Sequence, residues 1–141
     1  MYNLNSDGAG YNDKEAISII GFGRTGTDDL LRQAVAPFNL KIIADPAPEQ
    51  GLFDRSDNVS FAAKGVPAMC FSPGVTGFDA EIGKFYHQVA DGPETIDYDY
   101  LLKFCQAFAH TARLLADKDG RPQWVAGDKY EEAGRKLYEG K

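Results

Sequence analysis

The sequence predicts an α/β fold of three layers, in which a mixed, mainly parallel sheet lies between helices. The first observation is a strand-helix-strand unit over residues 16–44, since such a unit places its two strands parallel in one sheet. The second is an apolar run at residues 66–72 that ends at a Pro-Gly pair, which is typical of a buried strand ending at a surface loop. The third is helical periodicity from residue 97 or 99 to residue 115, which predicts a long helix that buries a core with the first unit.

The strand-helix-strand unit begins with the β-branched run at residues 16–20, which predicts a central strand. Thr27 is the predicted N-cap of the helix, and Asp28 and Asp29 complement the helix dipole in its first turn. Residues 40–44 then form the second strand. The apolar side chains that recur at helical spacing are Leu30, Leu31, Ala34, Val35 and Phe38.

Two further helices follow from local patterns. Ser56-Asp57 is a predicted N-cap for a short helix that ends at Gly65. The long last helix has one apolar side, on which Cys105 lies, and His110 falls opposite it, so we expect His110 to be solvated and exclude it as a metal ligand. The residues on the apolar side are Leu101, Phe104, Cys105, Phe108, Ala112 and Leu115.

The loop Gly21–Gly26 matches the G-x-G-x-x-G pattern of dinucleotide sites, because it lies between a strand and a helix and Asp45 ends the next strand. The two carboxylates of Asp28 and Asp29 would oppose a phosphate at that helix N-terminus, which disfavours a nucleotide. A non-catalytic α/β binding module that uses this loop for a nucleotide or another small ligand is the alternative function.

The composition narrows the class of protein. A chain of 141 residues with 43% hydrophobic residues suits one domain with a hydrophobic core. We expect residues 1–120 to form the main part of this domain and the charged tail at residues 121–141 to pack on its surface. The net charge of −6 argues against a nucleic-acid partner, and no apolar run is long enough to span a membrane. Cys70 and Cys105 both lie at apolar positions, which favours buried free thiols over a disulfide.

Candidate chemistry lies in the polar loop from Gly74 to Pro93. His87 is the one plausible transition-metal ligand in this loop, and Asp91, four residues later, could orient its second ring nitrogen. By itself, a histidine in a loop is more often a solvent-exposed side chain than a ligand. Ser6-Asp7-Gly8 by itself likewise indicates a turn, since Asp and Gly adopt turn geometry readily.

The order of motifs along the chain is more specific. The pieces are Arg55-Ser56-Asp57, then Phe61-Ala-x-Lys64-Gly65-Val66-Pro67-Ala68, then Tyr86-His87, and then Asp91-x-x-Glu94-Thr95-Ile96-Asp97 before a helix. This order resembles the C-terminal part of the M28 family of zinc-dependent aminopeptidases over most of residues 4–116. In that family the histidine of the late Tyr-His motif binds one of two metal ions, a role that the resemblance assigns to His87. A second ligand comes from an Asn-Leu-Asp-Met-like segment, which Leu4-Asn5-Ser6-Asp7-Gly8 matches at Asp7.

Two positions depart from the family pattern. Asn58 stands where the family usually has a histidine after Ser-Asp, and Asp54 stands where a tyrosine is common. Neither position is a metal ligand in the family, so the departures concern the substrate side of the site.

The resemblance implies an α/β fragment of the zinc aminopeptidase-like fold and a parent enzyme that removes N-terminal residues from peptides with two zinc ions. The family's other ligands, a His-x-Asp motif and a Glu-Glu pair whose first Glu is the base, lie upstream of the matched segment. We therefore expect the chain to be the C-terminal half of a catalytic domain that is inactive without its missing N-terminal half. We also expect self-association through an open sheet edge. Many bacterial members of the family are exported, although nothing in this sequence indicates a compartment.

Overall fold

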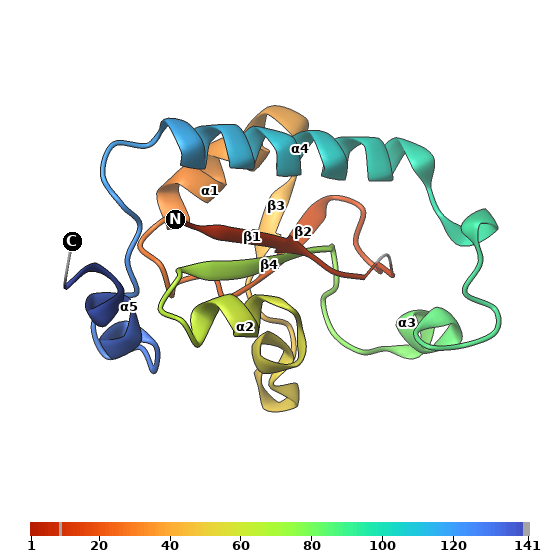
Figure 1. Cartoon of the computed structure of the whole chain (residues 1–141). Coiled ribbons are helices and arrows are strands. Elements are labelled where there is room, and N and C mark those ends of the chain that lie inside the picture. The colour runs from red at the N-terminus through yellow and green to blue at the C-terminus, as the bar shows by residue number, and fades with distance from the viewer. Residues whose placement is uncertain (9, 140–141) are drawn as a thin grey trace.

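The computed structural model describes residues 1–8 and 10–139, and it places a four-stranded sheet between two layers of helices (Figure 1). The strands are β1 (Asn3–Ser6), β2 (Ala16–Ile20), β3 (Lys41–Ile43) and β4 (Ala68–Pro73). The helices are α1 (Asp28–Val35), α2 (Asn58–Ala62), α3 (Ala80–Phe85), α4 (Tyr98–Asp117) and α5 (Glu131–Tyr138). Short 3-10 turns occupy Ala36–Phe38, Pro48–Gln50, Leu52–Arg55 and Pro93–Thr95. The predicted three-layer α/β class is confirmed.

The sheet is mixed, with strand order β1-β4-β2-β3. β2 and β3 run parallel, as the strand-helix-strand unit predicts, and β1 runs parallel to β4, whereas β2 and β4 are antiparallel. No strand was predicted at Asn3–Ser6, because this segment is short, is polar at three of its four positions and has no apolar alternation of its own. It becomes a strand through pairing with β4, in a register that places Asn5 opposite Cys70.

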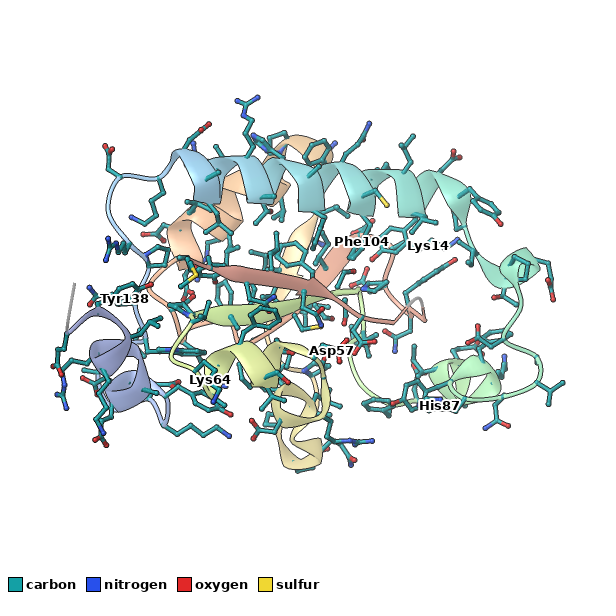
Figure 2. The ribbon with its side chains drawn as sticks, viewed as in Figure 1. Lys14, Asp57, Lys64, His87, Phe104 and Tyr138 are labelled. Atoms are coloured by element: carbon teal, nitrogen blue, oxygen red, sulfur yellow. The ribbon has the colours of Figure 1, made fainter. Side chains whose placement is uncertain are left out.

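Side chains of β4 alternate between the two faces of the sheet. Met69 and Phe71 pack against α1 and α4, in one core cluster with Ile17 and Ile19 of β2. Ala68 and Cys70 face the other side, where they pack with Phe53 and Trp124. Figure 1 shows α1 and α4 on the first face and α2 on the second, and Figure 2 shows Phe104 pointing from α4 toward the sheet.

The buried face of α4 differs from the predicted one. Cys105 is exposed, so its predicted burial is wrong, although both cysteines are free thiols as predicted. His110 is not simply solvated, because its Nδ1 lies 3.0 Å from the carbonyl oxygen of Ala34 in α1. The difference arises because α4 packs against α1 as well as against the sheet, which rotates the buried stripe. The buried residues of α4 are Tyr100, Phe104, Ala107 and Thr111.

The C-terminal residues form α5 and contribute to the second core cluster. Trp124 is 6% exposed, and its Nε1 donates a hydrogen bond to the carbonyl oxygen of Gly65 at 3.2 Å. The guanidinium of Arg24 lies 4.0 Å from the ring centre of Phe53 and donates to both carboxylate oxygens of Asp128 at 2.7 and 3.0 Å. These contacts fix the C-terminal residues to the glycine-rich loop. None of the helices in the described part of the chain has the length and apolar character that a membrane crossing requires.

The glycine-rich loop before α1 is occupied by the protein's own groups. The backbone N–H of Gly23 donates to Asp28 Oδ1 at 3.0 Å, where a bound phosphate would need that donor. Thr27 precedes α1, but its side chain forms no capping bond, since Thr27 Oγ1 lies 2.9 Å from Thr25 Oγ1 and 3.2 Å from the hydroxyl of Tyr2. The carboxylate of Asp28 therefore takes the place that a nucleotide phosphate would use.

Candidate active site

A cavity of about 410 Å³ opens beside the carboxyl ends of β1 and β4. Because parallel strands end at the same edge of a sheet, the segments that follow β1 and β4 meet there. Asp7 follows β1 directly, His87 lies in the long segment after β4, and both residues line this one cavity although they are 80 positions apart. The other lining residues used below are Arg55, Ser56, Cys70, Phe78, Ile82, Phe85, Tyr86 and Asp91.

The backbone of Asp7 is fixed by β4. The N–H of Asp7 donates to the carbonyl oxygen of Phe71 at 3.1 Å, which continues the β1–β4 ladder by one residue. The hydroxyl of Ser72 donates to the carbonyl oxygen of Asp7 at 2.8 Å. These two bonds fix the backbone of Asp7, whose exposed side chain belongs to a residue that lines the cavity.

The carboxylate of Asp7 is oriented by Ser56. Ser56 Oγ donates to Asp7 Oδ2 at 2.8 Å, and Asn5 Nδ2 donates to Ser56 Oγ at 2.9 Å. Within the described residues, the second carboxylate oxygen of Asp7 accepts no hydrogen bond. One oxygen is thus fixed by the protein while the other has no donor among the described residues, on a residue that lines the cavity. This arrangement is typical of a ligand oriented by its neighbours.

Cys70 contacts the hydrogen-bonded residues Asn5 and Ser56, with its Sγ 3.6 Å from Asn5 Nδ2 and 3.8 Å from Ser56 Oγ. Burial raises the pKa of the Cys70 thiol, so the group is a neutral thiol at neutral pH. The roles of Ser56 and Asn5 were missed by the sequence analysis, in which Ser56 belonged to a predicted helix cap. The bond from Ser56 to Asp7 joins residues 49 positions apart, so no local pattern could reveal it.

His87 lies just after α3, on the same side of the sheet as α2 (Figure 2). Its backbone has φ of 57°, in the left-handed region that residues other than glycine seldom adopt. Such a conformation costs free energy and persists where the surrounding structure fixes it, often at functional sites. The exposed imidazole stacks edge-on to the Tyr86 ring, with 4.2 Å between the ring centres. Among the described residues no hydrogen bond joins His87 to Asp91, although both line the cavity.

The segment that carries His87 is anchored at both ends by the connection between β1 and β2. Asn12 anchors its start, because Asn12 Oδ1 accepts from the Thr76 N–H at 2.8 Å and Asn12 Nδ2 donates to Asp79 Oδ2 at 2.8 Å. Tyr11 anchors its end, since its hydroxyl accepts from the Asp97 N–H at 2.6 Å and lies 3.4 Å from the carbonyl oxygen of Thr95. One short connection therefore carries Asp7 and also positions the segment of His87.

α3, which lies within this segment, and α4, which follows it, each begin with a capping carboxylate. Asp79 Oδ1 accepts from the N–H groups of Glu81 and Ile82 at 2.9 and 3.0 Å, and these bonds, with the one from Asn12, lower the pKa of Asp79. The ion pair with Lys14 and the bond from the Tyr100 N–H lower the pKa of Asp97 in the same way. Both aspartates are therefore ionised at neutral pH and stabilise the helix N-termini next to the loop.

Replacing Asn12 with alanine is expected to loosen the segment that carries His87. The substitution leaves the Thr76 N–H and Asp79 Oδ2 without a protein partner, while Asp79 Oδ1 keeps its two backbone donors. Each lost bond costs about 1–3 kcal/mol where the group stays buried and less where water replaces it. Hydrogen–deuterium exchange of residues 76–90 should become faster, while exchange in β2 and α4 stays unchanged. Gln33→Ala, an exposed change on α1, is the matched control. Unchanged protection of residues 76–90 in Asn12→Ala would contradict this anchoring role.

The structure thus brings Asp7 and His87 to one cavity. It places His110 elsewhere, against α1 on the opposite face of the sheet. Glu131 and Glu132 lie in α5 and do not line this cavity. Within residues 1–8 and 10–139, no three His, Cys, Asp or Glu side chains form a group that could hold a metal ion by themselves.

A scan against protein-family models gave one further finding. The model described as Peptidase family M28 matches residues 1–112, which include the whole sheet, both cavity residues Asp7 and His87 and most of α4. A search of curated proteins and a search of solved structures returned no match. The match covers well over half of the chain, and the segments it includes are those that build the cavity. The chain therefore belongs to peptidase family M28.

Proposed function

We propose that the chain is the C-terminal part of a metal-dependent aminopeptidase domain in which Asp7 and His87 are ligands of two different zinc ions. Membership of family M28 makes peptide-bond hydrolysis the general function. The observation that carries the more specific proposal is that Asp7 and His87 line one cavity at the carboxyl edge of two parallel strands. A carboxylate and an imidazole are both ordinary zinc ligands.

The two side chains fit such a role. Asp7 has one oxygen oriented by Ser56 and one without a hydrogen bond in the described part of the chain, and His87 is exposed to the cavity. When bound, zinc ions would polarise the scissile carbonyl and lower the pKa of a water molecule. Phe78, Ile82 and Phe85 supply an apolar wall that can hold a substrate side chain and exclude water.

The proposal requires groups beyond this chain. In family M28 the residues that match Asp7 and His87 bind different ions, so each ion needs further ligands. The base in that family is a glutamate of an upstream motif. β1 is one of the two edge strands of the described sheet, with β3 at the other edge, and the backbone of a further strand can pair with it. We propose that an N-terminal half of the domain pairs there, and that without it the chain self-associates and binds zinc at most weakly. The charge of −6 opposes such association.

The proposal is tested by comparing this chain with a version extended upstream, using leucyl and alanyl chromogenic substrates with added zinc. We expect turnover by the extended protein and none by the 141-residue chain. No turnover by a folded, zinc-loaded extended protein would overturn the aminopeptidase assignment. Turnover by the short chain that is abolished in His87→Ala would show that the ligand set is complete without the N-terminal half.

Replacing Ser56 with alanine should weaken zinc binding without removing a ligand. Loss of the bond to Asp7 Oδ2 frees the carboxylate to rotate, and removing such an orienting group typically lowers metal affinity or activity by about 10–100-fold. The measurement is zinc affinity of the extended protein by competition with a chromogenic chelator. Ser60→Ala, an exposed change on α2, is the matched control. Equal zinc affinities of Ser56→Ala and the unmodified protein would rule out this orienting role.

A further inference from the structure

Arg55 differs from the other arginines of the chain in having no partner among the described residues. Four of the others form ion pairs, Arg24 with Asp128, Arg32 with Asp29, Arg113 with Asp117 and Arg135 with Glu139. Arg121 lies over the ring of Tyr138, 4.8 Å from its centre. Within the described residues, the guanidinium of Arg55 pairs with no carboxylate and lies over no aromatic ring. Arg55 is also the arginine that lines the cavity of Asp7 and His87.

The position of Arg55 is set by its neighbours on both sides. Arg55 ends the 3-10 turn Leu52–Arg55, and the next residue, Ser56, donates to Asp7. The preceding acid is already paired, because Asp54 binds Lys129 and accepts from the hydroxyl of Tyr130 at 2.9 Å. Arg55 therefore lies on the cavity wall, one residue before the serine that contacts Asp7, and the carboxylate of Asp54 is directed to the C-terminal residues.

The cavity has a charge pattern that suits a peptide with a free carboxylate. Its described lining contains two acids, Asp7 and Asp91, and a single Lys or Arg side chain, that of Arg55. A guanidinium binds a carboxylate through two parallel hydrogen bonds, with more strength and directionality than an ammonium group gives. An exposed cation that the protein itself does not neutralise is available for such a bond from a ligand.

We infer that Arg55 binds a carboxylate of the substrate, so that the site prefers peptides whose free carboxylate lies within reach of the cavity. The inference rests on the proposed function and narrows its substrate class. A volume of about 410 Å³ suits a small ligand, which makes the C-terminal carboxylate of a dipeptide one source. An acidic first side chain is the other source, and both offer the same chemistry to Arg55.

The experiment uses the isotope-labelled 141-residue chain in the presence of a chelator, so that no metal ion competes for the carboxylate. Three dipeptides, Leu-Leu, Leu-Leu amide and Glu-Leu amide, are titrated while NMR shifts of cavity residues report dissociation constants. At least one carboxylate-bearing peptide should bind about tenfold more tightly than Leu-Leu amide, the range of a hydrogen bond to a charged group. Preference for Leu-Leu indicates the C-terminal carboxylate, and preference for Glu-Leu amide indicates the side chain.

Arg55→Gln should abolish the preference, leaving the three dissociation constants equal. Lys64→Gln is the matched control, because Lys64 is exposed and lies just after α2, away from His87 (Figure 2). Equal binding of the three peptides by the unmodified chain, a preference that survives Arg55→Gln, or no perturbation of the cavity by any peptide would each overturn the inference. Binding without discrimination leaves the proposed function intact, whereas discrimination together with an extended protein that fails to hydrolyse peptides would overturn the proposed function alone.

Discussion

Trp124→Ala is expected to lower the free energy of unfolding by about 3–5 kcal/mol, the range for removing a large buried aromatic side chain. Trp124 is 6% exposed and packs edge-on to Phe53, with 6.2 Å between the ring centres, and it also donates to the Gly65 carbonyl oxygen. The change leaves a cavity in the second core cluster and a carbonyl oxygen without its donor. Because small domains have a total stability of about 5–15 kcal/mol, the loss should be visible in any unfolding experiment.

Urea unfolding followed by circular dichroism measures this effect. Val125→Ala is the matched control, since Val125 is adjacent in sequence and exposed, and its substitution should change stability by less than about 1 kcal/mol. A small effect of Trp124→Ala would mean that residues 121–138 add little to the core. The predicted division at residue 120 would then hold as a boundary between a self-sufficient unit and a dispensable tail.

The largest effect on activity is expected from alanine substitutions of Asp7 and His87 in the upstream-extended protein. Each removes a proposed ligand of one ion, and losing the carbonyl-polarising contribution of a metal ion costs several kcal/mol of transition-state stabilisation. Since 1.36 kcal/mol is tenfold in rate, kcat/KM should fall by about a thousandfold or more. The bound zinc, counted by elemental analysis after gel filtration, should fall by about one ion per chain in each variant.

His110→Ala is the control for the activity experiment, because His110 packs against α1 on the other face of the sheet. It should retain nearly full kcat/KM and both zinc ions. Full activity of Asp7→Ala would mean that another residue supplies the second ligand. Asn5 and Ser56, which already contact Asp7 or its neighbours, would be the first positions to substitute next.

The parts of the fold that the sequence predicted are those with a local signal. The predicted strands at residues 16–20 and 66–72 and the predicted long helix follow from short-range apolar patterns, and they correspond to β2, β4 (Ala68–Pro73) and α4. β1 could not be predicted in this way, because its polar residues are stabilised by pairing with β4, which lies more than 60 residues away. The error at Cys105 has a related cause, since a helical wheel describes one apolar face while α4 contacts both the sheet and α1.

The candidate site shows the same difference between features with a local sequence signal and features fixed by distant contacts. Asp7 and His87 were predicted from motif order rather than from physical pattern, since Asp7 alone indicates a turn and His87 alone indicates an exposed loop. That they share a cavity agrees with the direction of β1 and β4, which brings the segments after both strands to one edge of the sheet. The supporting contacts of Ser56 and Asn12 connect distant segments through single hydrogen bonds, which leave no mark in the surrounding sequence.

The length of the short connection after β1 limits the distance between Asp7 and Asn12. Five residue steps separate Asp7 from Asn12, and a chain spans at most about 3.3–3.6 Å per residue, so this stretch can reach at most about 18 Å. Asp7 lies at one end of this stretch, and Asn12, which anchors the segment that carries His87, lies at the other. The separation between the two proposed ligands therefore depends on the number of residues in the connection. An insertion or deletion between Gly8 and Gly10 would therefore alter the distance between these two proposed ligands without replacing any residue of the site.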